Sequence, residues 1–296
     1  MKIKKLFSVA LIAVLLSLTT IISASATTFY YSSGYELYKD SADSGWIINS
    51  CSLEDSEISL PGYLLGGNVT TVGGMSFQNR TNLTYVNIPN SFTTIGAYAF
   101  SGCTSLKDIY FGENLKYLYV GAFRYCDSIK SLELSDTKLE LIANTAFYHC
   151  DELERVILPD TLESIGANAF ASCPKLETVY IGKNVKTISD KAFNESDNAI
   201  IYCYSDSYAH HYAENNRIDH VLLDGDKIGD VNGDGAVDIL DATEIQKYAA
   251  ESTDFTDEQF ELGDINKDGY CDVIDALLVQ KSVIGAYEIP QNIIRY

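Results

Sequence analysis

Basic residues are scarce in this chain. Its 296 residues include 21 Lys and Arg against 41 Asp and Glu, which gives a formal charge of -20. A surface this acidic repels phosphate backbones and anionic headgroups, so nucleic acid and membrane surfaces are poor candidate partners and cations are better ones. The acid is also uneven: residues 224–296 hold 17 acidic and 5 basic residues. About a quarter of the chain therefore carries more than half of the negative charge.

Long apolar runs occur only at the N-terminus. Lys2, Lys4 and Lys5 precede an apolar run from Leu6 to Ile22, and the small-x-small site Ala24-Ser25-Ala26 follows it. This order predicts a secretory signal peptide, residues 1–26, rather than the alternative of an uncleaved membrane anchor. We expect a mature chain that is secreted, extracellular or cell-surface, and not inserted in a membrane after cleavage.

A repeat of about 23 residues fills the middle of the chain. Its marker is a phenylalanine, which follows an alanine in all but the first copy: Phe77, Phe100, Phe123, Phe147, Phe170 and Phe193. Six residues after the marker comes an apolar triplet whose spacing predicts a short strand with alternate residues inward. The triplets are Leu83/Val86/Ile88, Leu106/Ile109/Phe111, Ile129/Leu132/Leu134, Leu153/Val156/Leu158 and Leu176/Val179/Ile181.

Units this short cannot bury an apolar face alone, so they must stack into a solenoid of parallel strands with the phenylalanines in an internal column. The string A-F-S-G-C-T-S-L-K-D-I-Y-F at 99–111 and its copies resemble the BspA-like bacterial leucine-rich repeats. The resemblance implies a mainly β solenoid with its C-terminal cap over residues 70–222, preceded by an N-terminal cap over 27–69.

Four cysteines lie three residues after the repeat phenylalanine: Cys103, Cys126, Cys150 and Cys173. This periodic placement predicts a buried, reduced structural slot, although paired rungs are compatible with the strand spacing. His149 beside Cys150 invites a thiol-protease hypothesis, which the periodic slot opposes. The sequence has no H-E-x-x-H, C-x-x-C or G-x-S-x-G pattern, and we expect no catalytic activity.

Residues between the inward triplet positions point outward along one face of the predicted solenoid. They include aromatic and charged side chains, which suit recognition of a protein or a glycan. High β-propensity explains the tyrosines equally well. The possible ligand face comprises Tyr85, Tyr110, Glu133, Arg155 and Tyr180.

The acidic quarter contains two matching segments 34 residues apart, D-V-N-G-D-G-A-V-D-I-L-D at 230–241 and D-I-N-K-D-G-Y-C-D-V-I-D at 264–275. Each places oxygen ligands at loop positions 1, 3, 5, 9 and 12, a carbonyl at 7 and glycine at 6, which is the spacing that wraps a chain around Ca²⁺. The sequence therefore predicts two calcium ions. The expected ligands are Asp230, Asn232, Asp234, Ala236, Asp238 and Asp241, then Asp264, Asn266, Asp268, Tyr270, Asp272 and Asp275.

These loops differ from a full EF-hand, because position 12 is Asp and there is no room for an entering helix. We expect exiting helices at 242–250 and 276–284, and a capping box at 256–259 that opens a short helix between them. The duplicated loop and helix resemble a type I dockerin over residues 226–290, a small all-α calcium-binding module. The resemblance implies docking onto a cohesin of a cellulosomal scaffoldin.

In the family that this segment resembles, partner contacts lie at loop positions 10 and 11 and at positions 17 and 18. Here these are Ile239, Leu240, Gln246 and Lys247, and in the second copy Val273, Ile274, Gln280 and Lys281. An alternative is that Ile239 and Val273 pack only the core of the module. The near identity of the two sets suggests that either helix could face the same cohesin.

The sequence thus predicts a secreted, non-catalytic binding or adhesion protein, attached to a scaffoldin through its dockerin-like segment, whose solenoid recognises an unidentified protein or glycan. One alternative is a cellulosomal enzyme or accessory factor that acts in the polysaccharide catabolic process. Another is a free adhesin whose calcium module serves for shedding or dimerisation.

Overall fold

The computed structural model describes residues 23–24, 27–40, 45–223, 227–234, 236–287 and 289. The predicted signal peptide lies outside these residues except for Ser23 and Ala24. No helix within the described ranges is long and apolar enough to cross a bilayer. The chain divides between Ile200 and Ile201 into two compact units.

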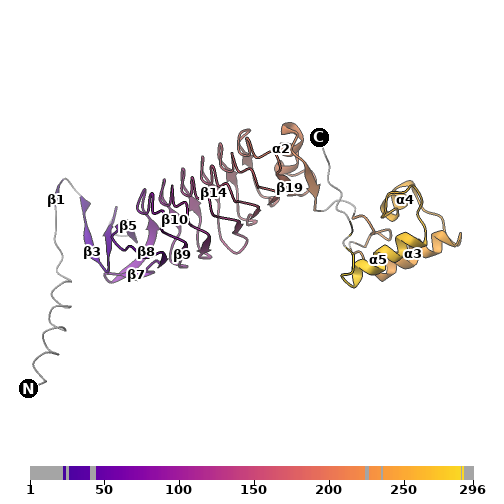
Figure 1. The fold of residues 1–296 in the computed structure, drawn as a ribbon, viewed down its shortest axis with the longest axis horizontal. Helices are drawn as coiled ribbons and strands as arrows, with labels where there is room; N and C mark the ends of the chain where they lie inside the picture. Colours follow the sequence, from indigo (N-terminus) through magenta and orange to yellow (C-terminus); the bar gives the residue numbers. More distant parts are fainter. Residues whose placement is uncertain are drawn as a thin grey trace, which may run out of the picture. The chain divides into compact units, whose positions relative to one another are not determined.

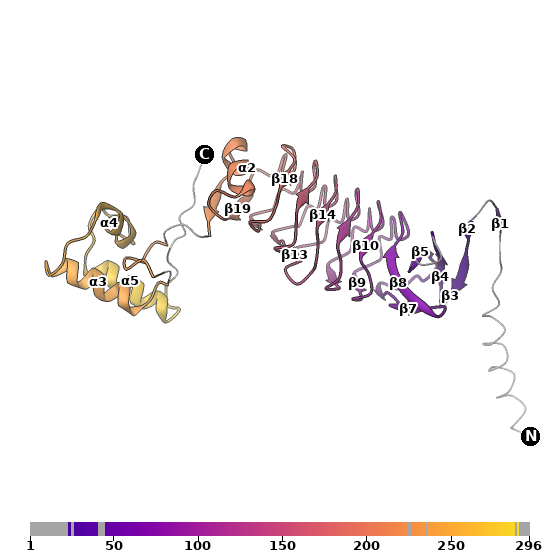
Figure 2. The ribbon, with the colours of Figure 1, turned by 180° about the vertical axis from the view of Figure 1, so that it is seen from behind.

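The first unit consists of short strands, which Figures 1 and 2 show stacked one behind another from β8 to β18. Its N-terminal part holds β1 (Ser23–Ala24), β2 (Thr27–Thr28), β3 (Tyr30–Ser32), β4 (Tyr35–Tyr38), β5 (Trp46–Cys51), β6 (Glu57–Ser59), β7 (Tyr63–Leu64) and β8 (Gly67–Val72). The repeats then supply β9 (Tyr85–Ile88), β10 (Thr94–Ile95), β11 (Asp108–Phe111), β12 (Tyr117–Leu118), β13 (Ser131–Glu133), β14 (Leu141–Ile142), β15 (Arg155–Ile157), β16 (Ser164–Ile165), β17 (Thr178–Tyr180) and β18 (Thr187–Ile188).

Each of the first five repeats contributes one strand to each of two faces, which confirms the predicted solenoid. The two-residue strands pair in parallel in the order β18-β16-β14-β12-β10. The longer strands β8 and β5 continue this sheet in parallel before the antiparallel β4 and β3. The triplet strands form the other face. They pair in parallel but in separate sheets, β11-β9-β6 and the one that contains β13, β15 and β17. The triplet face is therefore interrupted between β11 and β13.

The repeat phenylalanines form the predicted internal column. Consecutive rings from Phe77 to Phe193 lie 5.0–5.4 Å apart between centroids, with interplanar angles of 3–13°. The alanine before each phenylalanine from Phe100 onward is also fully buried, so this position belongs to the packed interior beside the column. Stacked rings of this kind add to the burial of their apolar area, and only neighbouring repeats can provide them.

The cysteine slot is buried and is also a hydrogen-bonding position. The thiol of Cys126 donates to the backbone carbonyl of Phe100 at 3.2 Å, and Cys103, Cys150 and Cys173 donate in the same way to the phenylalanine one repeat earlier. None of these four cysteines forms a disulfide. The last repeat has Ser196 in the slot, and its hydroxyl donates to the carbonyl of Phe170 at 2.8 Å. From the second repeat to the last, the slot therefore takes a small side chain with a donor, which the periodicity alone did not indicate; in the first repeat the same position is Arg80.

Some acidic side chains of the first unit form ion pairs with lysines of neighbouring repeats. Lys116 Nζ lies 2.7 Å from Glu140 Oε1, and a corresponding pair joins Lys175 to Glu152. Both pairs are solvent-exposed, so each contributes little to stability. They do reduce like-charge repulsion along the stack.

The second unit begins with the end of β19 (Ile200–Cys203), followed by α2 (Tyr208–Asn216) and β20 (His220–Leu222). It continues with the calcium-loop segment, which contains α3 (Ile239–Ala249), α4 (Asp257–Gly263) and α5 (Val273–Val283). β19 and β20 pair in parallel, and α3 and α5 lie side by side (Figure 1). Residues such as Ala242, Ile245, Ala276 and Val279 are fully buried between the helices.

Both long helices begin three residues earlier than predicted, at Ile239 and Val273, and end one residue earlier. The reason is that loop position 9, rather than position 12, caps each helix, so the last loop residues are already helical. The capping box over 256–259 is confirmed, with Thr256 Oγ1 accepting from the Gln259 backbone N–H at 3.1 Å.

Candidate calcium loops and docking face

In the first loop, side-chain oxygens fold back onto the amides of the loop itself. Asp230 Oδ1 accepts from the backbone N–H of Gly233 at 2.9 Å, and Asn232 Oδ1 accepts from that of Asp234 at 2.8 Å. Asp234 Oδ1 accepts from Ala236 N–H at 2.9 Å. These bonds hold three oxygen-bearing side chains along the inside of one turn, which is what an oxygen-only cation site requires.

The second loop repeats this pattern. Asp264 accepts from the N–H groups of Asp268 and Gly269 at 3.1 and 2.9 Å, and Asn266 Oδ1 accepts from Asp268 N–H at 2.9 Å. Gly269 at position 6 has φ of +86°, a conformation that favours glycine. Its counterpart in the first loop, Gly235, lies outside the described residues. The side chain of Asp268 accepts from Tyr270 N–H at 2.9 Å, as position 5 does in the first loop.

Positions 9 and 12 of each loop are also the cap of the following helix. Asp238 Oδ1 accepts from Leu240 N–H at 2.7 Å, while Asp241 accepts from Asn232 N–H and, through Oδ2, from Asp238 N–H at 2.8 Å. Asp272 and Asp275 make the equivalent bonds in the second copy. A single carboxylate thus ties the start of each loop to its end and to the first turn of the helix.

The carboxylate at position 12 of each loop is buried, and its pKa is raised. Asp241 and Asp275 are fully buried. Burial raises the pKa of the Asp241 carboxyl, two backbone N–H donors lower it, and the charges of Asp230 and Asp234 raise it again. A cation would compensate the charge of a buried carboxylate beside two others, and carboxylate and amide oxygens are the donors that Ca²⁺ prefers. The residues present therefore fit calcium.

Comparison with known families decides the identity of both segments. Residues 70–200 match the BspA type leucine rich repeat region in six copies, and residues 228–284 match the dockerin type I domain. The chain combines BspA-type leucine-rich repeats with a type I dockerin. Type I dockerins bind calcium and dock to cohesins, so the combination indicates a cellulosome-type protein with an extracellular or surface-associated location.

Solved structures resemble the repeat region. The leucine rich repeat protein TpLRR of T. pallidum is 27% identical with a TM-score of 0.55, over 58% of this chain and 79% of that one. The pneumococcal vaccine antigen PcpA is 14% identical with a TM-score of 0.52, over 67% of this chain and 48% of that one. At this identity the likeness concerns only the fold. A leucine rich cell surface protein of Faecalibacterium prausnitzii is 25% identical with a TM-score of 0.49, over 69% and 61% of the two chains. No curated protein matches this chain.

The predicted cohesin-contact positions of the dockerin lie at its surface. Ile239 and Leu240 are 52% and 56% exposed at the first turn of α3, and Val273 and Ile274 are 64% and 51% exposed at the first turn of α5. The structure therefore does not bury Ile239 or Val273 in the core of the dockerin. The polar members Gln246, Lys247 and Lys281 are exposed, and Gln280 is half-buried.

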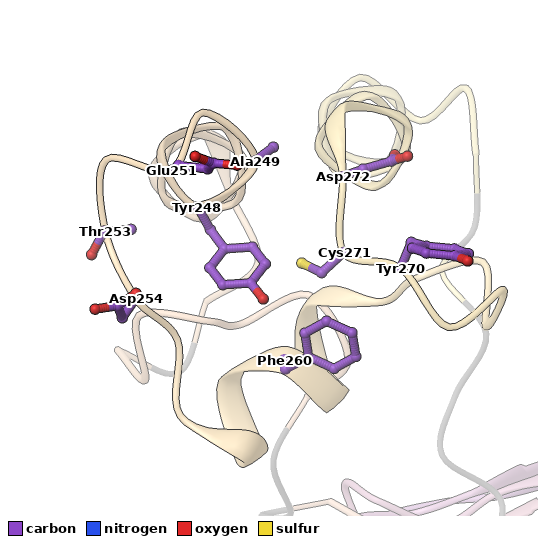
Figure 3. A pocket seen from close by; sticks show the side chains of 9 residues that line it. All are labelled: Tyr248, Ala249, Glu251, Thr253, Asp254, Phe260, Tyr270, Cys271 and Asp272. Atoms are coloured by element: carbon purple, nitrogen blue, oxygen red, sulfur yellow. The ribbon is translucent and has the colours of Figure 1, made fainter.

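A pocket of about 440 Å³ lies elsewhere in the dockerin, between the end of α3, helix α4 and the second calcium loop. Figure 3 shows the rings of Tyr248 and Phe260 on its inner side and the Cys271 sulfur pointing toward Tyr248. Burial raises the pKa of the Cys271 thiol to about 12, so this cysteine is a neutral packing residue at neutral pH.

On the solenoid, the five predicted face residues occupy two rows of the triplet sheets. Glu133 and Tyr180 both align with Ile157, whereas Arg155 lies two residues earlier in the register. Arg155 Nε lies 3.5 Å from Glu133 Oε1, and its guanidinium lies 5.2 Å from the centre of the Tyr180 ring. These three side chains form one contact group. Tyr85 and Tyr110 lie in the separate sheet formed by β6, β9 and β11.

A second group was missed because its members directly follow the repeat phenylalanine rather than the triplet. Arg124 lies over the rings of Tyr125 and Tyr148 at 4.6 and 5.1 Å. His149 Nδ1 pairs with Asp151 Oδ1 at 2.7 Å. Equal spacing from Phe123 and Phe147 was the sequence signal that could have identified this group.

The structure opposes the thiol-protease hypothesis for the adjacent Cys150. The Cys150 side chain is fully buried and donates to the Phe123 carbonyl at 3.4 Å. Burial raises the pKa of its thiol well above the usual value. A thiol held neutral in the core cannot act as a nucleophile toward a bound substrate.

Proposed function

We propose that this protein is a secreted, non-catalytic binding or adhesion protein that is attached to a cellulosomal scaffoldin by calcium-dependent docking of its dockerin to a cohesin. The observation that carries the proposal is the coupling within each loop between the buried position 12 carboxylate, the helix cap and the exposed aliphatic pair that follows. In this proposal residues 1–26 are the signal peptide, 27–69 and 70–222 form the capped solenoid, and 226–290 form the dockerin.

Each loop would hold one calcium ion, through the ligand sets given by loop positions 1, 3, 5, 7, 9 and 12. When bound, the ion supplies positive charge to three or more carboxylates that otherwise repel each other. The residues of the chain then keep the loop closed: Asp241 holds the first loop to α3, and Asp275 holds the second loop to α5. This closure places the exposed residues of each first turn in a fixed helix for the partner.

The cohesin would contact the aliphatic pairs Ile239/Leu240 and Val273/Ile274, with the Gln and Lys side chains two turns further along as a polar rim. An apolar centre with a polar rim is the usual composition of a protein interface. The solenoid would recognise a protein or a glycan through its triplet face, where Glu133, Arg155 and Tyr180 already form a group of charged and aromatic side chains.

The docking proposal is tested by capture of the full mature chain on immobilised type I cohesins, with calcium and with excess chelator. We expect capture in calcium and its loss with chelator. The double variant Asp230→Ala/Asp264→Ala should also lose capture. The control variant Asp254→Ala/Glu261→Ala removes the same charge outside the loops and should retain capture. Capture that survives chelation would refute calcium-dependent docking.

The non-catalytic part is tested separately, by incubating the purified chain with plant polysaccharides and measuring released reducing sugars. We expect no release above that of a heat-denatured control. Turnover that disappears when surface carboxylates of the solenoid are substituted would instead establish the cellulosomal enzyme.

A further inference from the structure

The two halves of the dockerin have similar residues at the eight predicted contact positions. They differ at the residues that lie between these positions on each helix. The exposed faces of α3 and α5 can be compared residue by residue, because the two copies are 34 residues apart. One turn after the aliphatic pair, α5 has Leu277, which is 46% exposed. The equivalent residue of α3 is Thr243. The centre of the face is therefore apolar on α5 and polar on α3.

The Thr243 hydroxyl is already engaged by its own helix. Its Oγ1 donates to the Ile239 carbonyl at 2.8 Å. A partner that covers this position gains only the methyl group, whereas covering Leu277 removes a branched aliphatic side chain from water. Apolar burial is the main favourable term in association, so this one difference favours α5.

The apolar strip also continues further along α5. Val283 and Ile284 are 48% and 77% exposed at the end of this helix. Their α3 equivalents are Ala249 and Ala250. Leu277 follows Val273 by four residues, and Ile284 follows Leu277 by seven. These spacings place the three side chains on one side of the helix.

The lysines of the two faces differ as well. Lys247 Nζ on α3 pairs with Glu244 Oε1 at 2.6 Å. The residue of α5 equivalent to Glu244 is Leu278, which packs against the module core. Among the described residues no acidic group forms an ion pair with Lys281. Lys281 can therefore pair with an acidic group of a partner without first losing an internal ion pair.

We infer that the dockerin presents α5 to its cohesin in one preferred orientation, with Leu277 as the specificity-determining centre of the face, and that the α3 face is a much weaker substitute. This inference rests on the proposed docking function and replaces the expectation of two equivalent orientations. The cohesin surface that it fits has an apolar patch opposite Leu277 and an acidic group within reach of Lys281.

The test is surface plasmon resonance of the full mature chain on immobilised type I cohesins in saturating calcium. The matched variants are Leu277→Thr, Thr243→Ala and the exchange Leu277→Thr/Thr243→Leu. Circular dichroism and calcium titration verify that each variant folds and loads. We expect Leu277→Thr to weaken binding by about tenfold or more, Thr243→Ala to change it by less than about twofold, and the exchange to regain part of the loss, because α3 has alanines in place of Val283 and Ile284.

Each other result overturns a distinct part of the reasoning. Two equivalent orientations predict a loss of at most about twofold for either single variant, since the untouched face still binds. An exchange variant that binds no better than Leu277→Thr would show that Leu277 does not act as the apolar centre. Failure of the unaltered chain to bind any cohesin would instead refute the proposed docking function.

Discussion

Substitution of Cys126 separates the two properties of the cysteine slot, its volume and its hydrogen-bond donor. The side chain is fully buried, and its thiol donates to the Phe100 carbonyl at 3.2 Å. That carbonyl also accepts from Cys103 N–H at 3.2 Å. Replacement by alanine removes one sulfur atom from a packed interior and one of the two donors.

The expected cost follows from these two losses. A cavity of one heavy atom and a lost weak hydrogen bond together lower the free energy of unfolding by about 1 to 2 kcal/mol for Cys126→Ala. Serine should cost less than about 1 kcal/mol, because Ser196 in the last repeat donates to Phe170 O and also accepts from Cys173 N–H at 3.0 Å. The hydroxyl thus satisfies both neighbours where the methyl group satisfies neither.

Urea unfolding followed by tryptophan fluorescence measures this difference. Trp46 is the single tryptophan of the chain and lies buried in β5, so its emission reports on the first unit and not on the dockerin. Because neighbouring repeats stabilise one another, the loss in a central repeat should lower the midpoint of the whole transition. A serine variant that is as unstable as the alanine variant, or less stable, would refute the donor role and leave volume alone as the requirement.

Three further predictions concern the cysteine slot, the column of phenylalanine rings and the calcium loops. Burial raises the pKa of the Cys103 and Cys173 thiols to about 11, so at pH 8 about one thiol in a thousand is ionised. Iodoacetamide should therefore leave both cysteines unmodified until urea is added, as measured by mass spectrometry. Alkylation in the native state would contradict this. Raising the pH toward 11 should increase the reaction, because the thiolate is the reactive form. Phe147→Ala, in the middle of the ring column, should lower the free energy of unfolding by about 3 to 5 kcal/mol in the same fluorescence assay, and a loss below about 1 kcal/mol would contradict the packing argument. Asp241→Asn and Asp275→Asn should each reduce calcium stoichiometry from two to one in isothermal titration calorimetry, and an unchanged stoichiometry would exclude that residue as a ligand.

The solenoid could be predicted because its signals are periodic. The spacing of the phenylalanines and triplets specifies which side chains face inward, and stacking is the only way to bury them. The interruption between β11 and β13 could not be predicted in this way. It coincides with Phe111, the one aromatic residue in its triplet position, whose ring lies 5.8 Å from Phe123 and nearly perpendicular to it. Periodicity identifies which side chains face inward, but it does not predict whether two neighbouring strands come close enough to pair.

The loops could be predicted for a different reason, since oxygen ligands at fixed spacing are a local pattern. The helix starts are harder to predict, because Asp238 and Asp272 match the ion-ligand pattern and also cap the next helix, so each helix begins inside the loop. The asymmetry between Leu277 and Thr243 was present in the sequence. The family resemblance does not indicate it, because Leu277 and Thr243 lie between the family's contact positions, and the 46% exposure of Leu277 is a property of the fold.

The double use of the same aspartates explains how an ion could control a partner surface that it does not touch. Asp272 caps α5, and the exposed pair Val273 and Ile274 occupies the first two helical positions after that cap. No residue therefore separates a proposed ligand from the docking face. If the loop carboxylates repel each other without an ion, the cap bonds from Asp272 and Asp275 are the first to weaken, and the first turn of the helix frays with them. In the proposed function, control by calcium would therefore require only the loss of one helical turn, not unfolding of the buried core formed by Ala276 and Val279.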